Sequence, residues 1–275
     1  MMSPDTDVFV LLLYYVNQVS CHLLFETGAG SHRRHIDMHA VASAIGRRTC
    51  TALPALHCFT GCDTTSAFVC KGKRKGFDVL ESALCSDSRS TATKANILSF
   101  WSVFESLGSV DTTVSDDQVH ALERFVCLLY GKSACSDVNK ARYSIFASRY
   151  QQRTLPGAGQ SGIDLSLLPP CLDSLKMHCA RVAHQTFIWR HAHDSIQNLP
   201  TPSGHGWKFV DNELQVDWFA GEMLPYDIID LLAERSPSDD DDDDTHINVG
   251  EFEDVGEDDV VDSIVDVIFE EEDDD

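Results

Sequence analysis

No apolar run in this sequence reaches the roughly 20 residues that a membrane-spanning helix needs, and no signal peptide precedes the first apolar segment. The ten cysteines include no C-x-x-C pair, the spacing of zinc knuckles and redox motifs. A G-x-S-x-G elbow, a Walker loop and a dinucleotide fingerprint are also missing. The cysteines indicate free thiols in a reducing compartment, so we expect an intracellular protein, nuclear or cytoplasmic.

Lys and Arg are absent from residues 236–275, which hold 20 of the 44 acidic side chains. Residues 1–235 carry the other 24 acidic side chains against 21 basic ones, a net charge of −3. The whole-chain charge of −23 therefore describes the tail and does not argue against a nucleic-acid partner for the rest. A segment this charged cannot bury enough apolar surface to fold alone, so we expect a disordered acidic tail.

Within the tail, the segment IVDVIFEEEDDD places Val265, Val267 and Ile268 in a V-x-V-I pattern followed by acids. The pattern resembles a motif that binds small ubiquitin-like modifier proteins by adding a strand to their sheet. The alternative is a solubilising tail with incidental apolar residues. The polyaspartate stretch could also imitate DNA and occupy basic side chains of the same chain.

The apolar run DTDVFVLLLYYV fits a buried strand by composition, and a helix by its length and its place after Ser3 and Pro4. The segments CHLLFET and HRRHIDM predict two short strands around a glycine turn. Helices are predicted for MHAVASAIG, TALPALHCFTG and KRKGFDVLESALC, the first ending at Gly46 and the second at Gly61.

Most of the remaining chain is predicted to be helical, notably DDQVHALERFVCLLYG and LDSLKMHCARVAHQTFIWRHAH, whereas residues 132–175 look irregular. The segment WKFVDNELQVDWF predicts a hairpin turned at Asp211 and Asn212. Core packing, rather than base stacking, is the predicted role of Trp189, Trp207 and Trp218. The predicted division of the chain is into residues 1–90, 91–235 and 236–275.

Three aspartates are candidates for a metal site. Asp5 and Asp7 form a D-x-D pair at the start of an apolar element, and Asp63 follows a helix end in FTGCD. Mg²⁺ and Mn²⁺ are held by oxygen ligands, and two-metal nucleases use clustered carboxylates to hold ions about 3.5–4 Å apart. The alternative is structural and common: Asp5 and Asp7 cap the N-terminus of a helix.

A basic segment begins eight residues after Asp63 and leads into a helix. Its predicted nucleic-acid-binding residues are Lys71, Gly72, Lys73, Arg74 and Lys75. Backbone N–H groups at a helix N-terminus bind phosphate well when cations lie nearby. The alternative is a solvated lysine face. An acidic site close to a phosphate-binding turn suits an enzyme that cuts a phosphodiester beside a bound backbone.

The segment FTGCDTTSAFVCKGKRKGFDVLESA resembles the part of flap endonucleases and PIN-like nucleases in which an L-x-G-C-D motif precedes a helix–two-turn–helix element. SPDTDV falls where those nucleases carry an acidic pair, and the resemblance covers roughly residues 3–85. It implies that the first strand and an acidic helix of the fold would precede Met1. The nuclease domain would then be N-terminally truncated and its activity reduced or lost.

Over most of residues 3–232 the chain also resembles a multicopy group of animal proteins that look derived from mobile elements. The shared segments here are SPDTDVFVLLL, ALPALHCFTGCDTTSAFVCKGK, FIWRHAH, GHGW and LQVDWF. Where that group usually has a glycine, this chain has Cys70, and a residue with a side chain adopts positive φ less easily than glycine.

The resemblance implies that Asp5, Asp7 and Asp63 are catalytic metal ligands for Mg²⁺ or Mn²⁺, with Asp5 and Asp7 sharing one ion. The predicted fold is an incomplete PIN/flap-endonuclease-like α/β domain with a helix–two-turn–helix, followed by a mainly helical extension and a disordered acidic tail. The predicted family activity is metal-dependent cleavage of DNA or RNA. The alternative is a non-catalytic module of mobile-element origin that binds nucleic acid or a protein.

Overall fold

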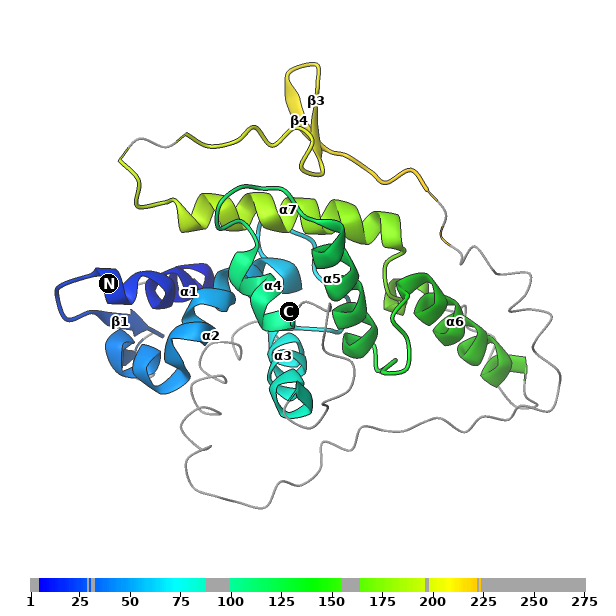
Figure 1. The fold of residues 1–275 in the computed structure, drawn as a ribbon, viewed down its shortest axis with the longest axis horizontal. Helices are drawn as coiled ribbons and strands as arrows, with labels where there is room; N and C mark the ends of the chain where they lie inside the picture. The colour runs from blue at the N-terminus through cyan, green and yellow to red at the C-terminus, as the bar shows by residue number, and fades with distance from the viewer. Residues whose placement is uncertain are drawn as a thin grey trace.

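A computed structural model describes residues 5–28, 30, 33–87, 99–154, 164–195, 198–221 and 223. Within these residues the chain combines helices with two small antiparallel sheets and is mostly helical (Figure 1). None of the described helices is both long and apolar enough to cross a membrane. The predicted tail, with Val265, Val267 and Ile268, lies outside the described residues.

The apolar run at the start of the chain forms a helix, α1, which spans Thr6–Tyr15. Its buried side chains are Phe9, Val10 and Leu13, and Leu13 follows the other two by four and three residues. They face α2, the neighbour against which α1 mainly packs. Composition alone also fits a strand here, but a helix places these three side chains on one buried face.

The short turn η1, Val16–Gln18, leads to two strands, β1 at Leu24–Thr27 and β2 at Arg34–Asp37. The strands pair antiparallel, with Phe25 opposite Ile36. The predicted pair of short strands around a glycine turn is therefore confirmed.

Helix α2, Met38–Thr60, follows β2 directly, and the carboxylate of Asp37 caps its N-terminus. Gly46 interrupts the helix with φ 80°, and Gly61 ends it with φ 119°. The two predicted helix ends are thus both present, the first as a kink inside α2. Because few residues other than glycine adopt positive φ, these two positions could be read from the sequence.

Two turns connect α2 to α3, Lys73–Asp87. In the first, the N–H of Thr65 donates to the carbonyl of Cys62 at 3.1 Å; in the second, the N–H of Lys71 donates to the carbonyl of Phe68 at 3.0 Å. Predicted helix α3 is confirmed, and it begins within the basic segment.

Glycines hold this connection close to α2. A Cβ on Gly76 of α3 would lie 2.6 Å from the side chain of Thr60, and a Cβ on Gly61 would lie 2.6 Å from that of Ala67. Side-chain atoms cannot approach so closely, so α3 and the first turn can pack against α2 only because these residues are glycines.

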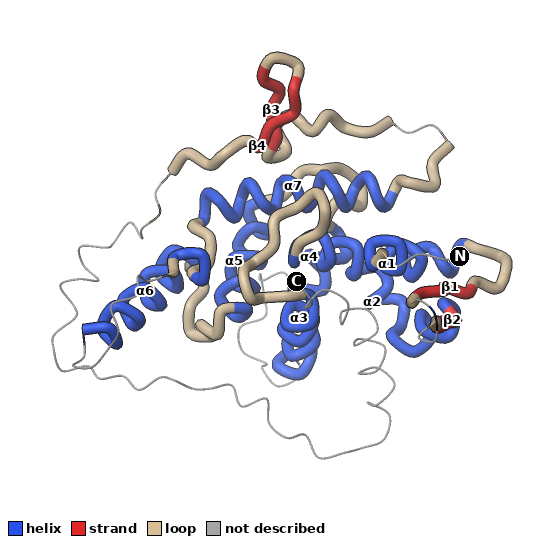
Figure 2. Tube along the Cα trace, turned by 180° about the vertical axis from the view of Figure 1, so that it is seen from behind, coloured by secondary structure: helices blue, strands red, loops and turns tan. Residues whose placement is uncertain are grey.

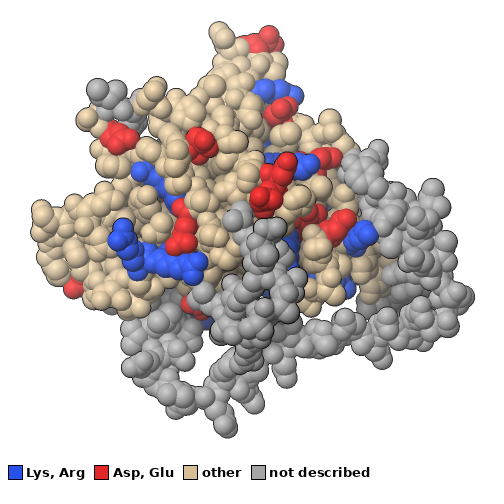
Figure 3. Space-filling view, viewed as in Figure 1, with Lys and Arg blue, Asp and Glu red and all other residues tan. Residues whose placement is uncertain are grey.

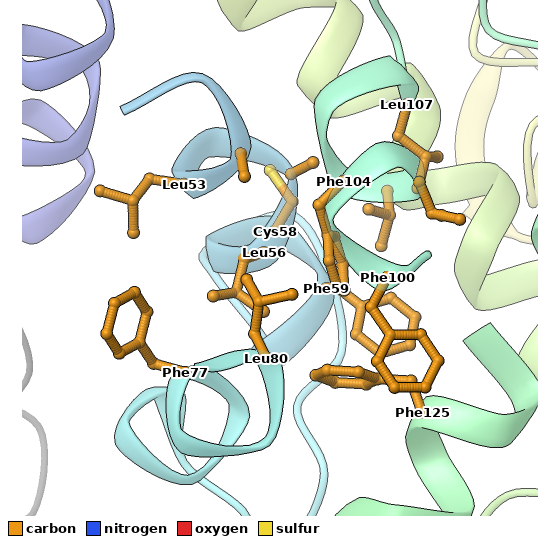
Figure 4. Close-up of a cluster of buried hydrophobic side chains, with 14 of the residues drawn as sticks. Leu53, Leu56, Cys58, Phe59, Phe77, Leu80, Phe100, Phe104, Leu107 and Phe125 are labelled. Carbon is orange, nitrogen blue, oxygen red and sulfur yellow. The ribbon is translucent and has the colours of Figure 1, made fainter. Parts of the chain in front are cut away.

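The core lies between α2 and three later helices, α4 at Phe100–Ser106, α5 at Asp116–Leu129 and α7 at Leu172–Arg190. Phe59 of α2 is fully buried, and its ring centroid lies 5.7 Å from that of Phe125. Figure 4 shows the aromatic rings of Phe59, Phe100, Phe104 and Phe125 gathered in this core. Edge-to-face packing of such rings stabilises the cluster beyond its buried area alone.

One buried cluster contains side chains from Phe9 to Ala183. Residues before and after position 90 therefore contribute to the same core. The predicted boundary at that position falls within a stretch, residues 88–98, that lies outside the described residues.

Arg190, at the end of α7, joins three helices. Its guanidinium donates to the backbone carbonyls of Thr51 in α2 at 2.8 Å and Phe104 in α4 at 2.9 Å, and also to the carbonyl of Glu105. The side chain is buried, and the carbonyls of Phe104 and Glu105 lie in the last turn of α4, where carbonyls have no partner within the helix. The arginine of the FIWRHAH segment thus has a structural role.

The prediction that residues 132–175 are irregular is wrong in part, because helix α6 spans Val138–Thr154. Its buried residues include Val138, Ala141 and Ala147, while most of its other positions are polar or charged. Such a short apolar face gives a weak helical pattern in the sequence. Figure 1 shows α6 at the opposite end of the molecule from α1 and β1.

The short turn η3, Leu165–Leu167, precedes α7, and a hairpin of β3, Trp207–Val210, and β4, Glu213–Val216, follows it. Asp211 and Asn212 form its turn with φ 50° and 67°, as predicted for a two-residue hairpin loop. Seen from behind in Figure 2, the hairpin lies on the outer side of α7.

Candidate nucleic-acid interface

The acidic pair at the start of α1 is engaged in contacts within the protein. Asp5 is the N-cap of α1, and its carboxylate accepts a hydrogen bond from the backbone N–H of Asp7 at 2.9 Å. This is the structural role that the sequence left open as an alternative to metal binding.

Asp7 binds the imidazole of His57 in α2, with 2.6 Å between Oδ1 and Nε2. The His57 side chain is completely buried, its ring lies 5.9 Å from that of Trp189, and its Nδ1 has no partner among the described residues. The Asp7 carboxylate is only partly exposed. The pair therefore connects the start of α1 to α2 across 50 residues of sequence.

Asp63 lies at the exposed side of the first turn after α2. Among the described residues, no group of three or more His, Cys, Asp or Glu side chains is arranged to hold a metal ion. As they lie, Asp5, Asp7 and Asp63 do not fit a shared Mg²⁺ or Mn²⁺ site, and we derive no cleavage step from them.

The residues of the basic segment have different surroundings. Lys73 is only 7 % exposed, and Arg74 forms an ion pair with Asp78 one turn later, at 3.1 Å. Lys75 is exposed, and Lys71 is half-buried with its ammonium 5.4 Å from the ring centre of Tyr130. Of the predicted phosphate-binding side chains, Lys71 and Lys75 are thus the two best placed to meet a ligand.

Lys71 lies close to other cations. Burial lowers the pKa of its ammonium, and the nearby positive charges of Lys75 and of Arg149 in α6 lower that pKa further. Sequence reasoning missed Arg149 because the helix that carries it was predicted to be irregular. We call Lys71, Lys75 and Arg149 the basic surface.

Two exposed aromatic residues accompany Arg149 on α6. The rings of Phe146 and Tyr150 stack at 6.2 Å with an interplanar angle of 21°, and Tyr150 is 57 % exposed. Phe146 and Arg149 are three residues apart and are therefore neighbours on the helix surface. Basic and aromatic side chains are interleaved here, the combination that binds single-stranded nucleic acids.

The charge on one face of the molecule is of mixed sign. On the face shown in Figure 3, Lys and Arg side chains are interspersed with Asp and Glu. The basic surface is therefore defined by the positive charges that act on Lys71, and not by a large basic area.

A pocket of about 460 Å³ lies beside the basic surface. Its walls are the segment 63–69 between α2 and α3, Tyr130 after α5, residues near η3, the first half of α7 and the β3–β4 hairpin. We call it the turn pocket. Tyr130 belongs to both features, because it lines the pocket and also carries the Lys71 ammonium over its ring.

His178 of α7 lines the turn pocket and is fully hydrogen-bonded. Its Nε2 pairs with the carbonyl of Phe59 at 2.8 Å and its Nδ1 with the hydroxyl of Ser66 at 2.9 Å. Since a carbonyl can only accept, Nε2 carries the proton and Ser66 donates to Nδ1. Burial lowers the pKa of His178 to about 4, so its imidazole is uncharged at neutral pH.

The hairpin is fastened to α7 on the other side of the pocket. Arg181 donates from Nη1 to the carbonyl of Gly206 at 3.1 Å, and His184 pairs through Nε2 with the carbonyl of Pro200 at 3.0 Å. These contacts place Trp207 and the hairpin base at the pocket wall.

The prediction that Trp218 packs in the core is wrong, because its side chain is 75 % exposed and lines the turn pocket. Trp207 is half-buried at the same pocket, and Trp189 packs partly against the core. Trp218 follows the end of a short two-stranded hairpin, and such a hairpin has no second layer to cover it.

Cys70 has φ 56°, although it carries a side chain. It is the third residue of the turn closed by the Lys71-to-Phe68 hydrogen bond, the position at which a turn with positive φ normally has glycine. The turn therefore keeps a glycine-like conformation with cysteine in place.

Comparisons of the chain with protein-family models, with curated proteins and with solved structures find no match.

Proposed function

We propose that this protein binds nucleic acid through the basic surface of Lys71, Lys75 and Arg149 and the aromatic pair beside it. The observation that carries the proposal is the Lys71 ammonium, held 5.4 Å from the ring centre of Tyr130 just before α3, with the positive charges of Lys75 and Arg149 acting on it. Like charges repel one another, and phosphates of a bound backbone would relieve that repulsion.

The N-terminus of α3 supports the same partner. Lys71 precedes the first turn of this helix and Lys75 lies in it, and the helix dipole favours an anion at that end. Phe146 and Tyr150 add ring faces on which bases can stack, and stacking tolerates any base sequence. The partner fitted by these groups is a nucleic-acid backbone bound mainly through its charge.

Metal-dependent cleavage, which the nuclease resemblance implies, stays a prediction, as does binding of Mg²⁺ or Mn²⁺. The contacts of Asp5 and Asp7 favour the non-catalytic alternative. Binding of small ubiquitin-like modifier proteins by the tail also stays a prediction, since that segment lies outside the described residues.

The test is the affinity of the full chain for a fluorescein-labelled 20-nucleotide single strand, measured by anisotropy over a range of salt concentrations. The triple variant Lys71→Gln/Lys75→Gln/Arg149→Gln should bind at least tenfold more weakly at low salt. Its plot of log affinity against log salt should be shallower by about 2, because each phosphate contact to a single strand contributes about 0.7.

A matched control removes the same charge from the other end of the molecule. Arg33 precedes β2, Arg34 begins it and Arg47 lies on α2. All three are exposed, and their triple replacement by glutamine should leave affinity within twofold. Equal losses in the two variants would mean that only net charge matters. Absence of binding by the wild-type chain at low salt would overturn the proposal.

A further inference from the structure

We propose that the turn pocket receives one unstacked base of a single-stranded nucleic acid whose backbone lies on the basic surface. The inference rests on the proposed function and specifies its ligand as single-stranded. The pocket and the basic surface meet at Tyr130, which lines the former and lies under the Lys71 ammonium of the latter. A nucleotide with its phosphate at Lys71 therefore has its base next to the pocket mouth.

The walls of the pocket suit a flat, polar-edged ring. Four aromatic side chains line it: Phe68, Tyr130, Trp207 and Trp218. A nucleobase stacks on such faces, and its edge needs donors and acceptors. The volume of about 460 Å³ falls within the range of small-ligand sites, roughly 300–1,000 Å³.

Charge separates the base from its phosphate. The carboxylate of Asp63 lies at the pocket wall, where it repels a phosphate. His178 is neutral and its hydrogen bonds are already made, and the guanidinium of Arg181, which also lines the pocket, donates to the carbonyl of Gly206. The cations Lys71 and Lys75 lie outside the pocket lining, which orients the backbone outward and the base inward.

The exposure of Trp218 also points to a ligand. An indole that is 75 % exposed leaves a large apolar area in water, and stacking a base on it would cover that area. Arg181 stiffens the same wall, since its guanidinium is fixed to the carbonyl of Gly206. A base paired inside a duplex cannot enter such a pocket without leaving its stack. The pocket therefore selects single strands, whereas the basic surface alone binds both forms.

The experiment compares three fluorescein-labelled probes of equal length on the full chain: a single strand, its duplex, and a single strand made of abasic sugar-phosphate units. Trp218→Ala should weaken binding of the ordinary single strand about tenfold, the effect of losing one base–aromatic stack. The same substitution should leave affinities for the duplex and the abasic strand unchanged, because neither places a base in the pocket.

Phe209→Ala is the matched control, since Phe209 is an aromatic residue on β3 that is 54 % exposed and does not line the pocket. It should change none of the three affinities. A loss that Trp218→Ala causes equally with all three probes, or with none, would overturn the inference about the pocket. If the pocket inference is overturned but the basic-surface triple variant still loses affinity, binding of nucleic acid by the basic surface is kept. If the triple variant loses no affinity either, the proposed function and the pocket inference are both wrong.

Discussion

One cluster of charged side chains lies at the start of α1 and another at the start of α3, and the two clusters differ in their contacts. At the start of α1, Asp5 caps the helix and Asp7 binds the buried His57, so both carboxylates have partners within the fold. At the start of α3, burial lowers the pKa of the Lys71 ammonium, and the positive charges of Lys75 and Arg149 act on it and lower that pKa further. Arg149 also acts on the carboxylate of Asp164. One nuclease-like resemblance predicted a ligand for both clusters, and the contacts favour a ligand for the second.

Charges that stabilise a fold can thus be told apart from charges that are available to a ligand. A carboxylate that accepts internal hydrogen bonds stabilises the folded state and loses that contribution if a metal draws it away. Neighbouring cations repel one another and so destabilise the folded state slightly. When a polyanion binds, the electrostatic contribution of these cations to stability becomes favourable. The first cluster should therefore report on stability and the second on binding.

Alanine substitutions at the three predicted metal ligands give the largest expected effect. Asp7→Ala removes the partner of a buried imidazole and should lower the free energy of unfolding by about 2–3 kcal/mol. Asp5→Ala removes a helix cap and should lower it by about 1 kcal/mol, while Asp63→Ala at an exposed turn should change it little. Urea unfolding of each variant measures the series.

If the three aspartates held a metal, the variants would differ in their response to Mn²⁺. If Mn²⁺ raised the melting temperature of the wild type, and if Asp5→Ala and Asp63→Ala both removed that rise, the three aspartates would act together as ligands. Mn²⁺-dependent cleavage of a branched or single-stranded DNA, abolished by Asp5→Ala/Asp63→Ala, would restore the nuclease interpretation. A graded stability series without either response would support the structural roles of Asp5 and Asp7.

The next largest effect is a pH dependence of stability that comes from His178, which lies between the core and the turn pocket. Its pKa is about 4 in the folded protein against 6.5 for an ordinary histidine, so the unfolded chain binds the proton more readily. Stability is therefore fully present above pH 6.5 and falls as the pH drops toward 4. Between pH 7 and pH 5 the loss from this residue should be about 2 kcal/mol.

The variant His178→Gln isolates that contribution, because glutamine has no charge to gain. It should be less stable than the wild type at pH 7 and should lose less stability on going to pH 5, measured by urea unfolding at both values. His184, whose pKa burial also lowers, contributes with the same sign in both proteins and so cancels in the comparison. If both proteins lost the same unfolding free energy between pH 7 and pH 5, His178 would not be the source of the pH dependence.

Local backbone chemistry explains which parts of the fold were predictable. Gly46, Gly61 and the pair Asp211–Asn212 adopt positive φ, a conformation tied to a few residue types, so helix ends and a hairpin turn could be assigned from the sequence. Helix α6 could not, because its apolar face is short and its other positions are polar. Missing α6 also meant missing Arg149.

The candidate site was predictable only in part because its contacts join distant segments. Lys71 and Lys75 follow from their place before a helix, but the pairing of Asp7 with His57 spans 50 residues and left no local signal. The exposure of Trp218 depends on where the hairpin rests on α7, which the sequence of the hairpin does not encode. The sequence gives the type of each side chain, but it does not give the contacts of that side chain in the folded protein.

Cys70→Gly should give the smallest effect and a change of opposite sign. Positive φ costs a residue with a side chain roughly 1–2 kcal/mol, and glycine removes that cost while adding freedom to the unfolded chain. The variant should be more stable by about 0.5 kcal/mol and should keep its affinity for nucleic acid, because the turn already has a glycine-like shape. Urea unfolding measures the stability and anisotropy measures the affinity.

Cys70→Val, which disfavours positive φ further, should destabilise the turn and weaken binding through displacement of Lys71. A stabilising Cys70→Val would show that the turn, and with it the basic surface, does not depend on this backbone conformation.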